Sequence, residues 1–285
     1  MVPLPRTDLA CEATALWQKS AQTTTQLQGV VARDEELNGC KVTTVEILDE
    51  YGAKELCKPI GKYYTLELDK LLHRNENAFE DAAAALSILL KRLSLPAQGD
   101  VVCACLGNPD ITPDAVGPIA AQNIIVTRHM KRSMPQEFAS FRSVSVVRPG
   151  VLGTSGIESA ESVQAFCSAV SPALIIVVDA LASADLARLG RTVQITDTGI
   201  APGSGVGNDR AALNAQALGI PVVAIGVPTV VDAAAFSTEA AADGMFVTPR
   251  TVDDLVRRTG KLIGYAINLA LHQGLTCGDA DMLLE

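Results

Sequence analysis

From residue 100 to its end, the chain alternates short apolar runs with alanine-rich segments, and this alternation constrains the fold more than any other feature. The apolar runs fall at 101–106, 123–126, 143–147, 173–178, 192–196, 221–226 and 245–247. Helix-like segments separate several of them, at 159–170, 209–218 and 231–242. Continuous apolar strands that alternate with helices are typical of a mostly parallel central sheet flanked by helices. We therefore expect an α/β core over residues 100–285, closed by a helix from Asp253 to about His272.

The first 99 residues have a different pattern, which predicts a small N-terminal α+β appendage. Residues 1–40 are polar and favour helix, with Asp8 as the N-cap of the segment that follows it. The stretches 41–48 and 63–68 are β-branched and aromatic, which predicts strands, and 77–93 predicts a strong helix. The expected division is 1–99 and 100–285, packed together as one domain.

Composition excludes several classes of function. The 285 residues carry a net charge of −9, and an acidic surface repels nucleic-acid phosphates and anionic lipid. Aromatic residues make up only 4%, which leaves little for base stacking. No apolar run reaches the roughly 18 residues of a membrane span, and the first residues lack a signal-peptide core. We expect a cytoplasmic protein that binds neither nucleic acid nor membranes.

The seven cysteines include no CxxC pair. Cys103 and Cys105 lie in an apolar run, where a strand points both thiols to one face. We expect them to be buried, inert thiols rather than a disulfide or a metal site.

Aspartates follow three of the predicted strands: Asp110 and Asp114 after the first, Asp179 after the fourth and Asp197 after the fifth. Ligands of open parallel sheets collect beyond the carboxyl ends of the strands, so these carboxylates are expected along one rim. The alternative is structural, because aspartate is common at helix N-termini and in turns after strands.

Paired carboxylates can hydrolyse an amide. Two like charges a few ångströms apart do not both ionise cheaply, so one keeps its proton and the pair holds an acid and a base together. The base then activates water while the acid protonates the substrate. Two carboxylates and a histidine could instead hold a divalent metal ion. We expect no cofactor and no metal.

Other groups near the predicted strand ends are candidates for substrate binding. Arg128 and Arg148 each follow an apolar run, where they could tune the carboxylates or receive an acidic substrate side chain, the alternative being ordinary surface solvation. The loop at Gly203, Ser204 and Gly205 offers backbone N–H groups as donors to a carbonyl oxygen. A GxSxG nucleophile elbow and an HExxH motif are both absent from the sequence.

At these motifs the sequence resembles the germination protease family (peptidase family A25) of endospore-forming bacteria. The resemblance rests on blocks that cover nearly the whole chain in order: RTDLA (6–10), GKYYTLE (61–67), LGNPDITPDAVGP (106–118), VTRH (126–129), RPGVLGTSGIES (148–159), DALAS (179–183), QITDTGIAPGSGVGNDR (194–210) and LGIPVVAIGVPTVVDA (218–233).

The resemblance implies an endopeptidase with a core like that of hydrogenase-maturation proteases. Such an enzyme begins degradation of small acid-soluble spore proteins during germination, in the forespore or spore core, and assembles as a homotetramer. It is made as a zymogen that loses an N-terminal propeptide by its own activity. The family's two essential aspartates match Asp114 and Asp179, and its processing region matches the bond between Asp8 and Leu9. The alternatives are a metal-assisted peptidase of hydrogenase-maturation type and a non-catalytic binding module.

Two departures from the family pattern bear on these expectations. Few residues precede the RTDLA block, so the propeptide is unusually short. Ala184 and Asp185 follow the DALAS block where a basic residue is expected, which removes a basic subsite from that loop.

Overall fold

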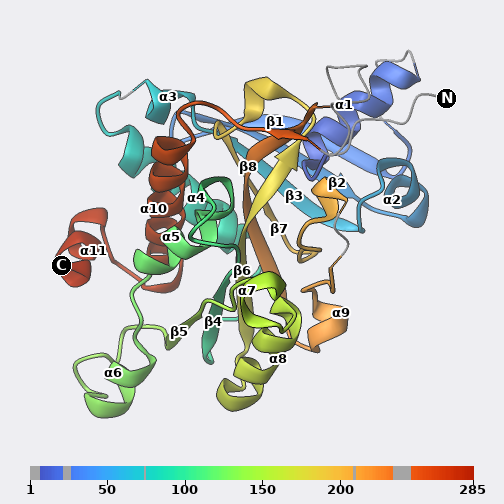
Figure 1. The fold of residues 1–285 in the computed structure, drawn as a ribbon. Helices are drawn as coiled ribbons and strands as arrows, with labels where there is room; N and C mark the ends of the chain where they lie inside the picture. The colour runs from blue at the N-terminus through green and yellow to red at the C-terminus, as the bar shows by residue number, and fades with distance from the viewer. Residues whose placement is uncertain (1–6, 22–26, 74, 208–209, 234–244) are drawn as a thin grey trace.

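A computed structural model describes residues 7–21, 27–73, 75–207, 210–233 and 245–285. Within these residues the strands form a nine-stranded sheet in the order β1-β2-β3-β7-β8-β6-β4-β5, with β9 paired to β8 (Figure 1). The strands are β1 (Val30–Leu37), β2 (Cys40–Ile47), β3 (Gly61–Glu67), β4 (Val101–Cys105), β5 (Val144–Val147), β6 (Leu174–Ser183), β7 (Thr192–Thr196), β8 (Val222–Asp232) and β9 (Phe246–Val247).

Strand direction divides the sheet into two halves. Strands β5, β4, β6 and β8 pair in parallel, which confirms the predicted α/β fold with a parallel core. Strands β1, β2, β3 and β7 pair antiparallel, and β7 also runs antiparallel to β8. The N-terminal strands therefore continue the core sheet through the β3–β7 pair, and strand direction reverses where β7 meets β8.

Helices cover both faces of the sheet (Figure 1). The α-helices are α1 (Ala10–Ser20), α2 (Glu50–Leu56), α3 (Asp69–Leu72), α4 (Ala78–Arg92), α5 (Val116–Gln122), α6 (Arg128–Ser133), α7 (Leu152–Ser155), α8 (Ser159–Val170), α9 (Ala215–Leu218), α10 (Val252–Leu271) and α11 (Cys277–Leu284). Short 3₁₀ turns occur at η1 (Thr112–Asp114), η2 (Leu186–Arg188) and η3 (Ser204–Val206). None of the helices in the described residues is long and apolar enough to cross a bilayer.

The two faces are covered differently. On one face, α4, α5 and α10 bury a single large apolar cluster that includes Cys103 and Cys105. On the other face, α1 and α2 cover the antiparallel half, and α8 covers the parallel half, in two separate clusters. The middle of this second face, over β7, β8 and β6, is where the polar side chains described below lie. The thiols of Cys103 and Cys105 are fully buried and form no disulfide, as expected.

Three predicted elements differ in the structure, and a fourth lies mostly outside the described residues. Residues 30–37 form strand β1 instead of helix, because Asn38 and Gly39 adopt the positive φ angles of a two-residue hairpin turn that pairs β1 with β2. The apolar run 123–126 is a buried connection instead of a strand, since the Ile125 N–H donates to the Asn268 side chain. In the predicted helix at 209–218, of which the structure describes 210–218, the described helical part is Ala215–Leu218.

The fourth element is the helix predicted at 231–242. Strand β8 continues through Asp232, and residues 234–244 lie outside the described part of the chain.

Candidate active site

Asp179 is buried within a strand. Strand β6 runs five residues past the apolar run and ends at Ser183, so Asp179 pairs with Gly226 of β8 instead of following the strand end. The residue is 5% exposed, and its Oδ1 accepts a hydrogen bond from the Ala180 N–H at 2.9 Å. Burial, with the nearby charge of Asp114 as the next contribution, raises the pKa of Asp179 well above its ordinary value.

Asp114 is brought to the same place by the loop after β4. Because Cys105 of β4 lies opposite Val178, this loop leaves its strand level with Asp179. Gly107 makes the turn with a φ of +106°, and a Cβ there would lie 2.0 Å from the Asp114 carbonyl oxygen. The Asp114 Oδ2 accepts from the Asn108 N–H at 2.8 Å, and burial raises the pKa of this carboxyl too.

Both aspartates line one cavity of about 650 Å³. Its walls come from the segments after β4, β5 and β7 and from strand residues of β6, β8 and β9, and they include Ile111, Leu152, Ala160, Gly203, Val206 and Arg210. Arg210 pairs with Glu158 across this wall at 3.2 Å. Sequence reasoning missed both of these residues, although Arg210 ends the same glycine-rich block that contains Gly203.

The N-terminal segment enters this cavity through Asp8. The Asp8 Oδ2 accepts from the Ala182 N–H at 2.8 Å, its Oδ1 accepts from the Ser204 hydroxyl at 2.9 Å, and its N–H donates to the Ala182 carbonyl at 3.0 Å. Gly205 lies so close that a Cβ there would be 2.2 Å from the Asp8 Oδ2. The predicted N-cap role of Asp8 is therefore wrong, because its carboxylate binds β6 and η3, and Leu9 occupies the cap position without a side-chain bond.

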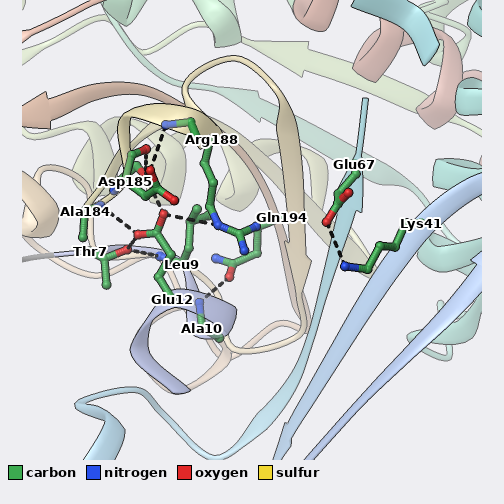
Figure 2. A network of polar contacts seen from close by, with 12 residues as sticks. Thr7, Leu9, Ala10, Glu12, Lys41, Glu67, Ala184, Asp185, Arg188 and Gln194 are labelled. Atoms are coloured by element: carbon green, nitrogen blue, oxygen red, sulfur yellow. Dashed lines mark hydrogen bonds and ion pairs between the residues drawn. The ribbon is translucent and has the colours of Figure 1, made fainter. Parts of the chain in front are cut away.

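A second polar network holds the residues after Asp8 (Figure 2). The side-chain amide of Gln194, on β7, donates to the Asp8 carbonyl oxygen at 3.0 Å and accepts from the Ala10 N–H at 2.8 Å. The buried Glu12 carboxylate accepts from the Ser183 hydroxyl and from the Ala184 N–H, and Arg188 lies 3.6 Å away. Neither Gln194 nor Glu12 was singled out from the sequence.

Both predicted arginines lie outside the described lining of this cavity. Arg128 pairs with Asp100 at 2.9 Å, next to the start of β4 and thus at the opposite end of that strand from Asp114. Arg148 follows β5 and is exposed, and the described lining of the 650 Å³ cavity does not include it.

The expectation of a single rim of aspartates is wrong for Asp197. Because β7 is antiparallel to β8, its end points away from the carboxyl ends of β4 and β6, and the Asp197 carboxylate accepts from the Lys62 N–H instead. Asp110 is exposed in the loop after β4. Among the residues that the structure describes, no group of three or more histidine, cysteine or acidic side chains is arranged to hold a metal ion.

Comparison with known proteins identifies the family of this chain. The family model described as "Germination protease" matches residues 8–243. A germination protease of Caldanaerobacter subterraneus subsp. tengcongensis is 40% identical, with 98% of each chain covered, and one of Clostridium perfringens is 35% identical, covering 98% of this chain and 99% of its own. A [NiFe] hydrogenase maturation protease, HycI, from Thermococcus kodakarensis is similar in structure with a TM-score of 0.38 and 19% identity, over 63% of this chain and 98% of its own. The chain belongs to the germination protease family and is a peptidase.

Proposed function

We propose that Asp114 and Asp179 are the acid–base pair of an endopeptidase. The observation that carries this proposal is that both carboxylates line one cavity, with the pKa of each raised by burial. A pair that shares one proton near neutral pH holds the base and the acid that amide hydrolysis requires.

The different surroundings of Asp114 and Asp179 indicate which carboxyl is the base and which is the acid. Asp179 is the more deeply buried, and the charge of Asp114 further disfavours its ionised form, so Asp179 keeps the proton. Asp114 then acts as the base: it takes a proton from a water molecule, whose oxygen attacks the substrate carbonyl carbon. Asp179 gives its proton to the amide nitrogen, the C–N bond breaks, and an acid and an amine leave.

The position of Asp8 supports processing of this chain by its own site. Asp8 lines the same cavity as Asp114 and Asp179, and its backbone lies along β6 beside Ala182. The bond between Asp8 and Leu9 is therefore the proposed cleavage site, and residues up to Asp8 are the propeptide of a zymogen. In this zymogen, Asp8 at the cavity wall would compete with another peptide for the groups that bind it.

The substrates, assembly and location follow from the family. We infer that the enzyme degrades small acid-soluble spore proteins in the spore core, during germination, and that it works as a homotetramer. Gly203, Ser204 and Gly205 are the proposed substrate-binding loop, because Ser204 binds the carboxylate of Asp8, Gly205 lies against that carboxylate, and Gly203 lines the cavity.

The test is cleavage of a purified small acid-soluble spore protein, followed on a gel, with the intact mass of the enzyme measured in parallel. Wild-type protein should cut the substrate after losing residues 1–8. Asp114→Asn and Asp179→Asn should each abolish both reactions, while Asp110→Asn, in the same loop as Asp114 but exposed, should leave them unchanged. Cleavage by either active-site variant would reject the pair.

A further inference from the structure

The Gln194 side chain forms hydrogen bonds with the backbone on both sides of Leu9. Its Nε2 donates to the carbonyl oxygen of Asp8 at 3.0 Å, and its Oε1 accepts from the N–H of Ala10 at 2.8 Å. The two contacts fix which end of the amide is the donor, because only a nitrogen can donate to the carbonyl and only an oxygen can accept from the N–H. The residue is 5% exposed, so these bonds lie out of bulk water.

The register of the sheet places Gln194 and Asp179 in one row. Gln194 on β7 and Asp179 on β6 both lie opposite Gly226 of the strand between them. Side chains opposite one another in a sheet point to the same face, and two strand spacings separate their Cα atoms by about 10 Å. Gly226 contributes no side chain to the middle of the row, where Leu181 packs against it.

Asp8 lies between the two outer strands of this row. Its N–H and carboxylate are bound by Ala182 of β6, and its carbonyl oxygen is bound by Gln194 of β7. Asp8 and Leu181 also line both the 650 Å³ cavity and a second cavity of about 250 Å³, which Gln194 helps to form. The carbonyl of the Asp8–Leu9 bond thus has a donor from β7, and Asp8 itself lines the cavity that holds the aspartate pair.

We propose that Gln194 is a catalytic residue of the peptidase, whose side-chain N–H binds the carbonyl oxygen of the bond being cut. This inference rests on the proposed function. When water attacks that carbonyl carbon, the oxygen gains negative charge, and a donor already in place stabilises the charge without reorganisation. The Oε1 contact to the N–H two residues further on sets the register of the peptide, so that the bond after the acidic residue is the one presented to the pair.

The competing explanation is that Gln194 only anchors the start of α1. Ser183 provides the matched control, because its hydroxyl donates to Glu12 of the same helix, whereas its described hydrogen bonds do not involve Asp8 or Leu9. Full-length wild type, Gln194→Ala, Gln194→Glu and Ser183→Ala should be compared for the rate of self-cleavage after Asp8, by intact mass, and for melting temperature. The processed enzymes should then be assayed on a small acid-soluble spore protein, with kcat and KM measured separately.

If Gln194 binds the reacting carbonyl, Gln194→Ala slows self-cleavage about 100- to 1,000-fold, and the loss on the added substrate is in kcat. Ser183→Ala retains a rate within a few-fold of wild type, whatever its melting temperature. Gln194→Glu recovers activity relative to wild type as the pH falls, because a protonated carboxyl regains a donor. Rates of Gln194→Ala and Ser183→Ala that simply follow their melting temperatures would overturn the assignment. An inactive wild type, or an active Asp179→Asn, would instead overturn the proposed function on which it rests.

Discussion

Replacing Asp179 by asparagine should stabilise the folded protein at neutral pH while it abolishes cleavage. In the unfolded chain the carboxyl ionises above about pH 3.9, whereas in the folded protein burial and the charge of Asp114 hold the proton on. Between the two pKa values the folded state binds more protons than the unfolded state, so the free energy of unfolding falls as the pH rises. The asparagine side chain does not ionise, so it removes this loss of unfolding free energy at neutral pH.

The magnitude follows from the size of the pKa elevation. Each pKa unit corresponds to about 1.4 kcal/mol, and at this chain length 1 kcal/mol shifts the melting temperature by about 2–4 °C. The acceptor role survives, because the asparagine oxygen can still accept from the Ala180 N–H that lies 2.9 Å from Oδ1 in the wild type. Asp179→Asn should therefore melt several degrees above wild type at pH 8.

Thermal unfolding at a series of pH values between 4 and 8 measures this effect. The difference between Asp179→Asn and wild type should shrink toward pH 4, where both states of the wild-type carboxyl approach full protonation. The exposed control Asp110→Asn should show no such trend. A variant that melts at or below wild type at pH 8, or by a margin independent of pH, would refute the assignment of a protonated, buried Asp179.

Three further outcomes test other parts of the structure. Gly205→Ala places a Cβ 2.2 Å from Asp8 Oδ2 and 2.6 Å from Ala182 Cβ, so it should lower the free energy of unfolding by about 1–3 kcal/mol. Because the substitution displaces Asp8, an added aminopeptidase should trim the N-terminus faster than in wild type. An unchanged rate of trimming would contradict the contact between Gly205 and Asp8. Burial lowers the pKa of His272 to about 4, so the free energy of unfolding should fall by about 3 kcal/mol as the pH drops from above 6.5 to 4. His272→Gln should make the melting temperature less dependent on pH over this range. Chelation with EDTA should leave spore-protein cleavage unchanged, since the described residues offer no cluster of three metal ligands; activity lost to EDTA and restored by one added ion would favour the metal-assisted alternative.

Local sequence signals predicted the parallel half of the sheet well. The runs that became β4, β6 and β8 are apolar on both faces, which is typical of strands buried between two helical layers. The same signal failed at 123–126, because Asn268 on α10, 143 residues from Ile125, supplies the acceptor that a neighbouring strand would have supplied. A contact across such a separation leaves no trace in the local pattern.

Some residues of the candidate site could likewise be predicted from the sequence, and others could not. Asp114 and Asp179 could be found because each follows an apolar run, and the structure places both at one cavity. Gln194 was missed because it lies inside the apolar run of β7, where a polar residue gives no sign of its partner, and that partner is the backbone near residue 8. The direction of β7 was also not readable from its own residues, so the expected place of Asp197 was wrong.

The reversal of strand direction at β7 has a consequence for biosynthesis. Strand β7 is joined on one side to β3, more than 120 residues earlier in the chain, and on the other side to β8, which is followed only later by β9 and the long helix α10. Contacts between such distant segments form late, because closing the intervening loops costs entropy before any contact repays it. A nascent chain that has not yet added β8 has no row from Gln194 to Asp179. With the roles proposed for Asp179 and Gln194, we therefore expect an incomplete chain to cut no peptide bond and cleavage to begin only after β8 has been added to the sheet.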